Sequence, residues 1–309
     1  MSIIEKAIIK LDQDKNSTAE LKQVRHGVEF NEEPQNEPKA APRLKPANPV
    51  KAKPKAVPVD NHNVKTVEID LDKLHQLGMV TPDTERSSIA EQFRRIKRPL
   101  LDKIFNSGSS TRPFHHNLIM ITSSLPGEGK TFCAVNLAIS IALELDRTVL
   151  LIDADVARPA IARYLKVNHD QEDYQTGLMD ILQDKNLDLA DVMVKTNIDK
   201  LTMLFAGRHH KHATELLASH SMSKLLSEIS DRYPDRVIIF DSPPLLLSTE
   251  ARVLTNQMGQ IVLVVEAGST TQHAVREVLS QLKTTSNVSL IYNKAKEFAG
   301  GDYYGDYYA

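Results

Sequence analysis

The sequence has little cysteine, no surplus of charge of either sign, and no long apolar run. Its single cysteine, Cys133, excludes an internal disulfide and is typical of a reducing compartment. No run approaches the roughly 18–20 apolar residues that span a bilayer, and no signal peptide is evident. We therefore expect a cytoplasmic protein that reaches a membrane only by docking. With 38 basic and 40 acidic residues, nothing indicates nucleic-acid binding.

The strongest pattern is a phosphate loop, which follows an apolar run and precedes a helix-like stretch. Backbone N–H groups in such a loop wrap phosphate oxygens, and the helix start adds partial positive charge. Lys130 is expected to reach the β- and γ-phosphates, and Thr131 to hold Mg²⁺. Gly129 lets the backbone approach a phosphate, and Gly127 permits a positive φ. The opening glycine of the general pattern is Ser124 here.

Two further apolar runs end in aspartates. The first leads into Asp153 and Asp155, and the second leads into Asp241. A carboxylate at the end of a buried strand is costly unless it meets a cation or hydrogen-bond donors. Mg²⁺ on nucleotide phosphates supplies such a cation, directly or through its waters. We expect Thr131, Asp153 and Asp241 to hold the metal, although one strand-end acid alone could instead cap a helix.

Apolar runs and helical stretches alternate regularly from residue 117 onward. The strands are expected at 117–123, 147–153, 200–206, 236–241, 260–266 and 287–292. The helices are expected at 130–145, 158–165, 176–183, 213–231, 248–257 and 271–284. This alternation predicts an α/β fold with a doubly wound, mostly parallel sheet of the P-loop NTPase type, and ligands at the carboxyl ends of the strands.

The composition divides the chain into four parts. Residues 1–13 read as an amphipathic helix, which either docks on a partner or on lipid, or packs back on the main domain. Residues 14–63 are rich in proline and lysine and are expected to form a disordered linker. Residues 64–299 hold the P-loop domain. Residues 300–309 form an expected flexible tail.

A further helix is expected over residues 84–105, with Pro99 kinking or ending it. Glu91, Arg94 and Lys97 recur every three residues on its polar side. By itself this spacing fits a solvated helix face.

The C-terminal tail differs from the rest of the chain. Two Gly-Asp-Tyr-Tyr units there contain four of the eight tyrosines. Tyrosine normally fills cores or interfaces, whereas on a flexible terminus its hydroxyl is accessible. The alternative is a tail whose rings pack onto the domain. The candidate phosphoacceptors are Tyr303, Tyr304, Tyr307 and Tyr308.

Together these segments resemble the bacterial tyrosine kinases, which have a P-loop fold and are unrelated to eukaryotic protein kinases. The resemblance spans about residues 85–309. The family's Walker A pattern matches Pro126–Thr131, its Walker A′ pattern matches the Asp-x-Asp of Asp153 and Asp155, and Walker B matches Val237–Asp241. Ala157 replaces the first member of the family's basic pair, and Arg158 keeps the second.

The resemblance implies an ATP- and Mg²⁺-dependent, non-specific protein-tyrosine kinase. Catalytic roles are implied for Lys130, Asp153, Asp155 and Asp241. Nucleotide contacts are implied for Pro126, Gly127, Glu128, Gly129, Lys130, Thr131, Phe132 and Asn293. The tail would then be autophosphorylated, either on the same subunit or, as the family favours, on a neighbouring one. Which aspartate accepts the phenol proton is left open.

Assembly is also implied by the resemblance. Glu91 and Arg94 fit the family's Glu-x-x-Arg-x-x-Arg oligomerisation motif, but Lys97 replaces the last arginine. A homo-oligomeric ring, such as an octamer, is implied. Its subunit contacts are expected to be weaker, because lysine cannot form the bidentate hydrogen bonds that arginine forms. The stretch Arg98–Leu101 and the N-terminus resemble exopolysaccharide autokinases linked to exosortase loci. These imply control of exopolysaccharide polymerisation or export, at the inner membrane, through a membrane-spanning chain-length or co-polymerase activator.

Two other functions fit the same motifs. A partitioning or positioning ATPase carries a second lysine five residues before the invariant one, where this chain has Leu125. A nucleotide-bound scaffold of a polysaccharide export complex would keep the motifs without catalysis. Phosphotyrosine formation from ATP separates the kinase from both.

Overall fold

The computed structural model describes residues 65–84, 87–105, 115–165, 167, 176–232, 235–282 and 287–295. All of them belong to the unit Val59–Ala309. The expected N-terminal helix, the linker and the tyrosine tail lie outside the described residues. Within these ranges, no helix has the length and apolar character that crossing a bilayer requires.

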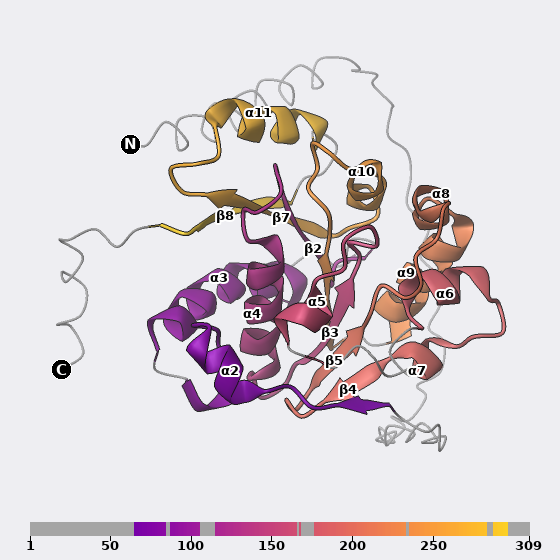
Figure 1. The fold of residues 1–309 in the computed structure, drawn as a ribbon, viewed down its shortest axis with the longest axis horizontal. Helices are drawn as coiled ribbons and strands as arrows, with labels where there is room; N and C mark the ends of the chain where they lie inside the picture. The colour runs from indigo at the N-terminus through magenta and orange to yellow at the C-terminus, as the bar shows by residue number, and fades with distance from the viewer. Residues whose placement is uncertain are drawn as a thin grey trace, which may run out of the picture. The chain divides into compact units, whose positions relative to one another are not determined.

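The described residues form one eight-stranded sheet in the order β1-β4-β5-β3-β6-β2-β7-β8 (Figure 1). Every neighbouring pair is parallel except β4 and β5, which are antiparallel. The strands are β1 Thr66–Val67, β2 Leu118–Ser123, β3 Thr148–Asp153, β4 Val194–Thr196, β5 Leu201–Leu204, β6 Arg236–Asp241, β7 Gln260–Glu266 and β8 Val288–Asn293. This order confirms the predicted doubly wound, mostly parallel sheet, and all six predicted strands are present.

Helices cover both faces of the sheet, and a separate apolar cluster lies under each set. Ile119 and Ile121 of β2 pack with α3 and α4 in one cluster, whereas Leu118 and Met120 pack with α9 and α10 in the other. The helices are α2 Leu71–Gln76, α3 Ser88–Phe105, α4 Lys130–Ala142, α5 Ile161–Tyr164, α6 Leu178–Gln183, α7 Leu189–Val192, α8 Ala213–Leu217, α9 His220–Arg232, α10 Thr249–Thr255 and α11 Gln272–Gln281, with a 3₁₀ turn at Pro82–Thr84. Burial on both faces explains the continuous apolar runs of the strands.

Several details differ from the sequence-based expectations. The short strands β1 and β4 and the short helices α2 and α7 were not predicted, and the helix expected at 213–231 is broken into α8 and α9. Pro99 does not end α3, which continues to Phe105. The residues beyond the proline, Leu100, Leu101 and Ile104, are buried in the same cluster as Phe93. Packing of this stripe therefore outweighs the hydrogen bond that proline cannot donate.

The expectation that Lys97 lies on the polar side of α3 is wrong. Its side chain is 5% exposed and pairs at 2.6 Å with the carboxylate of Glu144, just beyond α4. Its Nζ also donates a 2.6 Å hydrogen bond to the carbonyl of Ser140, in the last turn of α4. Glu91 and Arg94 remain about half exposed and pair with each other at 2.6 Å. Lys97 thus joins α3 to α4 and is not part of the exposed motif.

Replacing Lys97 should therefore lower the free energy of unfolding by more than replacing Arg94 does. Breaking a fully buried pair costs about 3–5 kcal/mol. Because Glu144 is 23% exposed and Arg98 lies 3.5 Å from it, we expect about 2–3 kcal/mol for Lys97→Ala. For Arg94→Ala we expect a loss of less than about 1 kcal/mol in unfolding free energy, because its ion pair with Glu91 is exposed. Urea unfolding of both variants at one low protein concentration measures the difference, and equal losses would contradict the assignment.

Candidate active site

Three segments that are distant in sequence meet at the carboxyl edge of the sheet. The strands β3, β6 and β2 are neighbours, and Asp153 pairs in register with Asp241, which in turn pairs with Ile121. The phosphate loop follows β2 and ends where Lys130 begins α4. The predicted convergence of the loop with both strand-end acids is therefore present.

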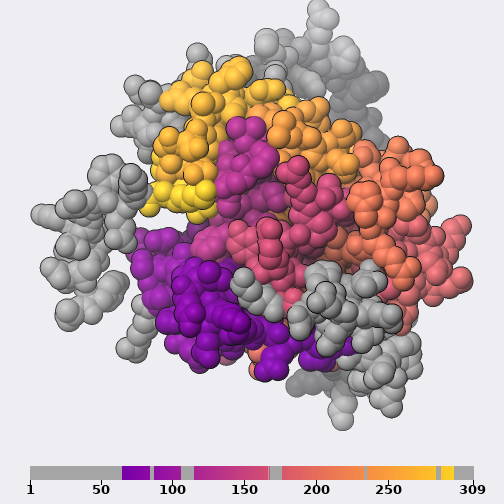
Figure 2. All heavy atoms as spheres, viewed as in Figure 1, coloured from indigo at the N-terminus to yellow at the C-terminus, as the bar shows by residue number. Residues whose placement is uncertain are grey.

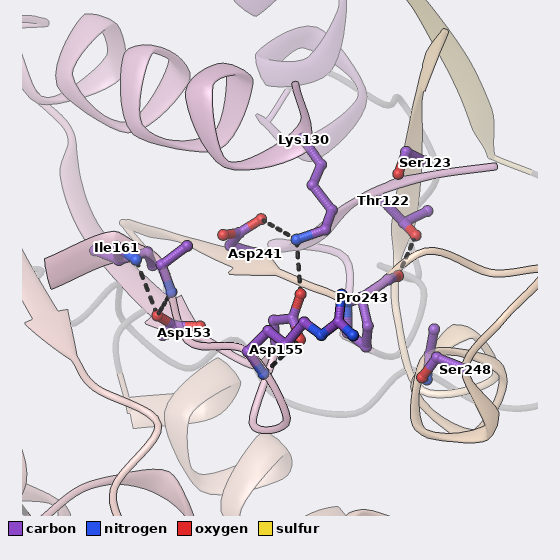
Figure 3. Close-up of polar contacts among 12 residues, drawn as sticks. Thr122, Ser123, Lys130, Asp153, Asp155, Ile161, Asp241, Pro243 and Ser248 are labelled. Atoms are coloured by element: carbon purple, nitrogen blue, oxygen red, sulfur yellow. Dashed lines mark hydrogen bonds and ion pairs between the residues drawn. The ribbon is translucent and has the colours of Figure 1, made fainter. Parts of the chain in front are cut away.

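Lys130 points between two carboxylates (Figure 3). Its Nζ donates a 2.7 Å hydrogen bond to Oδ2 of Asp155 and lies 4.0 Å from Oδ1 of Asp241. Burial opposes the charged form of Lys130, but Asp241 and Asp155 more than compensate, so its pKa is raised. The ammonium is thus charged at neutral pH and held at the site where phosphates are expected.

Asp153 and Asp241 are buried acids with unused acceptor atoms. Oδ2 of Asp153 accepts hydrogen bonds from the amides of Ala160 and Ile161, both at 3.0 Å. Among the described residues, Oδ1 of Asp153 and both carboxylate oxygens of Asp241 have no hydrogen-bond partner. Such orphaned buried oxygens are suited to a hard cation or its waters.

The pKa values of this acidic pair reflect that lack of compensation. Burial raises the pKa of Asp153 to about 7, helped by the charge of Asp241 and opposed by the two amides. Burial also raises the pKa of Asp241 to about 6, opposed by Lys130 and the nearby Thr131 hydroxyl. In the described ranges, no three His, Cys, Asp or Glu side chains are grouped to hold a metal alone. Mg²⁺ fits here only with further ligands, such as Thr131 and phosphate oxygens.

The loop itself is shaped by Glu128, whose role the sequence did not reveal. Glu128 is 3% exposed, and its Oε2 accepts hydrogen bonds from the amides of Ser124 and Leu125 at 2.7 and 3.0 Å. Its Oε1 accepts a hydrogen bond from the hydroxyl of Thr270. The amides at the start of the loop are therefore engaged, and a phosphate must use those from Gly127 onward.

The end of β8 supports the loop from the other side. The side chain of Asn293 donates to the carbonyl of Glu128 at 2.9 Å, and Lys294 donates to the carbonyl of Gly127 at 2.8 Å. Gly129 has φ 98°, and a Cβ there would lie 2.0 Å from Nδ2 of Asn293, so only glycine fits. Figure 2 shows the yellow C-terminal elements against the magenta phosphate-loop segment. Asn293, for which the family resemblance implies a nucleotide contact, lies against the loop backbone.

A cavity of about 440 Å³ opens beside Lys130, Thr131 and Asp155. Pro126, Gly127 and Gly129 of the loop line it, together with further residues that the motif analysis did not assign. Those are Ala160, Arg163, Tyr164, Leu247, Ser248 and Glu250, and the cavity is also lined by Pro243 and Pro244, which follow Walker B. Phe132 lies instead in a second groove on the other side of the loop, with Tyr292 and Asn293. Only a three-dimensional contact could have identified the Leu247 segment, since it carries no motif.

Comparison with known proteins agrees with this geometry. A sequence model of a family described as an AAA domain matches residues 116–295. Tyrosine-protein kinase YwqD of Bacillus subtilis (strain 168) is 32% identical over 213 residues, which make up 68% of this chain and 81% of that protein. Tyrosine-protein kinase CpsD of Streptococcus agalactiae is 29% identical over 72% of this chain and 95% of that protein.

Two solved structures are similar in fold. The kinase domain of Escherichia coli tyrosine kinase ETK has a TM-score of 0.57 and 23% identity, covering 77% of this chain and 94% of that chain. The VpsO kinase domain has a TM-score of 0.52 and 30% identity, covering 68% of this chain and all of that chain (100%). With its phosphate loop and its two aspartate-terminated strands in register, the chain belongs to the family of bacterial tyrosine kinases.

Proposed function

We propose that this chain transfers the γ-phosphoryl group of MgATP to tyrosine hydroxyls of its own C-terminal tail. The observation that carries this proposal is the meeting of Lys130, Asp155 and Asp241 at one phosphate loop. Lys130 exchanges Asp155 for the β- and γ-phosphates, and the loop amides from Gly127 onward stabilise charge on the transferred group. Thr131, Asp153 and Asp241 hold Mg²⁺ and its waters, which neutralise phosphate charge when bound.

The transfer step requires a proton acceptor for the phenol. The phenol oxygen bonds to the γ-phosphorus as the bond from that phosphorus to the β,γ-bridging oxygen breaks, and ADP leaves. Asp155 lines the cavity, whereas Asp153 is 1% exposed and bound by two amides. We assign the proton to Asp155, which is released when Lys130 moves to the phosphates. Because a carboxylate is much less basic than a phenolate, the proton moves late in the transfer.

The acceptors we propose are Tyr303, Tyr304, Tyr307 and Tyr308. An extended chain from Lys294 to Tyr308 spans at most about 50 Å, enough for its own site or that of a neighbour. We favour the neighbour within a homo-oligomeric ring, in which the exposed Glu91 and Arg94 of α3 make subunit contacts. Lys97 has no place in those contacts because it is buried against α4.

The setting we propose is exopolysaccharide polymerisation or export, with a membrane-spanning co-polymerase as activator that holds the chain at the inner membrane. One relative supports it: the succinoglycan biosynthesis transport protein ExoP of Rhizobium meliloti (strain 1021) is 33% identical over 66% of this chain and 24% of that protein.

Phosphotyrosine formation tests the proposed reaction. The full chain incubated with γ-labelled ATP and Mg²⁺ should incorporate label on tyrosine. Changing all four tail tyrosines to Phe should abolish labelling while leaving ATP affinity intact, because the expected nucleotide contacts all lie outside the tail. Lys130→Met should reduce labelling at least about 100-fold through lost charge stabilisation. Undiminished labelling of the four-Phe variant would place the acceptors elsewhere, and ATP hydrolysis without phosphotyrosine would favour a positioning ATPase.

The raised pKa of the proposed metal ligand Asp241 predicts how the stability of the protein depends on pH. The pKa of Asp241 is raised from 3.8 to about 6 on folding. Folding is therefore helped by protonation of Asp241 at low pH, and this contribution is lost as pH rises through about 6. Without nucleotide or Mg²⁺, the non-ionising variant Asp241→Asn should exceed the parent in stability above pH 7 by about 2–3 kcal/mol.

This stability difference should shrink as pH falls below about 6, because the folded parent then holds the acid protonated, and it should vanish only below the unfolded pKa of 3.8. Urea unfolding of Asp241→Asn and the parent at pH 7.5 and pH 4.5 measures it. Asp155→Asn is the control, because it removes the 2.7 Å partner of Lys130 and should bring no such gain. A variant that is less stable than the parent at pH 7.5 would show that Asp241 is already compensated without a metal.

A further inference from the structure

One wall of the phosphate cavity is apolar and exposed, which phosphate binding does not require. Leu247 is 67% exposed, among the highest values for large apolar side chains in the described residues. It lines the same cavity as Lys130, Thr131 and Asp155, together with Pro243 and the half-buried Pro244. A triphosphate and a divalent cation are bound by charges and amides, so they do not account for this wall. Phe132 and Asn293, for which nucleotide contacts are expected beyond the loop, line the second groove instead.

The segment that carries the wall is fixed in place. The amides of Ser242 and Leu245 donate to the carbonyls of Ile121 and Ser123 at 3.0 and 2.9 Å. The hydroxyl of Thr122 donates to the carbonyl of Pro243 at 2.7 Å (Figure 3). Leu245 is fully buried and anchors the segment, whereas its near neighbour Leu247 turns to the surface. The wall is thus held in a set position relative to the start of the phosphate loop.

The same cavity has a basic rim. Arg158 and Arg163 both line it, and both are exposed. The backbone amide of Arg158 is bound to Oδ1 of Asp155 at 3.1 Å, so the rim is tied to the residue to which we assign the proton. A ligand that uses the whole cavity would combine an apolar ring with a carboxylate beside it.

The C-terminal sequence contains that combination twice. Asp302 precedes one tyrosine pair, and Asp306 precedes the other. Accordingly, we propose that Pro244 and Leu247 bind the ring of the acceptor tyrosine, while Arg158 and Arg163 attract the aspartate before it. The occupant is the segment Gly301–Ala309. This inference rests on the proposed kinase function and adds the features by which the site selects its acceptor.

Peptide binding tests the wall independently of turnover. The probe is a fluorescein-labelled peptide with the sequence of residues 299–309, and the protein is the full chain with its four tail tyrosines changed to Ala, so that its own tail does not compete. A non-hydrolysable ATP analogue and Mg²⁺ fill the phosphate site. Leu247→Ala should raise the peptide Kd about five- to tenfold through lost apolar contact, while the affinity for the analogue stays within about twofold. Leu247→Met should restore peptide binding.

Matched controls separate the wall from general effects. Leu145 is 87% exposed and does not line the cavity, so Leu145→Ala should leave the peptide Kd unchanged. A peptide with its four tyrosines changed to Phe should bind within about threefold of the parent peptide, because the wall contacts the ring. A peptide with Ala at those positions should lose binding. Equal peptide affinity of Leu247→Ala and the parent would overturn the assignment.

The basic rim is tested by a double-mutant cycle. The peptide with Asn at both aspartates, and the combined variant Arg158→Gln, Arg163→Gln, should each weaken binding several-fold. Together they should weaken it little more than either alone, because each change removes the same attraction. Additive losses would show that the arginines do not contact those aspartates. Failure of the kinase function appears separately, as absent phosphotyrosine in the labelling assay, whereas failure of the wall leaves that labelling intact.

Discussion

At the carboxyl edge of the sheet, three buried carboxylates lie around a single ammonium, that of Lys130. The rest of the site depends on this excess of negative charge. Asp153 and Asp241 are almost fully buried, and Asp155 is 5% exposed. Lys130 satisfies Asp155 directly and Asp241 only at 4.0 Å. The raised pKa values of Asp153 and Asp241 are the consequence, because two buried anions lack full compensation. Burial of these two acids therefore costs free energy that a divalent cation would offset, as is common where function competes with stability.

The opposite side of the loop is already fully organised. Glu128 binds two amides at the start of the loop and the hydroxyl of Thr270, while Asn293 and Lys294 bind two of its carbonyls. Lys294 also pairs with Glu266 at 3.1 Å, which ties the end of β7 to the same contacts. The loop is thus held in shape before any ligand arrives, so little reorganisation remains for the reaction step. The charge imbalance and the fixed loop are complementary: one favours binding of a cation, and the other fixes where phosphates lie.

Local patterns in the sequence were sufficient for the sheet and for the central site residues. Apolar runs that end in Asp153 or Asp241 identify both the strands and the edge at which they meet, because parallel strands bring their carboxyl ends together. The same patterns were insufficient wherever a partner distant in sequence decides the outcome. Lys97 has the spacing of an exposed residue, yet Glu144 and Ser140 draw it inward. The sequence does not indicate that Glu128 shapes the loop, because its partner Thr270 is distant along the chain. The strands β1 and β4 are too short to produce a pattern.

The burial of Lys97 also constrains how α3 could meet another subunit. Of the three motif positions, only Glu91 and Arg94 remain exposed, and they pair with each other at 2.6 Å. An exposed pair of this kind contributes at most about 1 kcal/mol, so a partner carboxylate could replace Glu91 at small cost. Arg94 can form a bidentate contact that a lysine cannot, which makes it the stronger of the motif's two basic residues for a subunit interface. A contact through α3 would therefore depend on Arg94, while Lys97 keeps the helix seated on α4 and close to the phosphate loop.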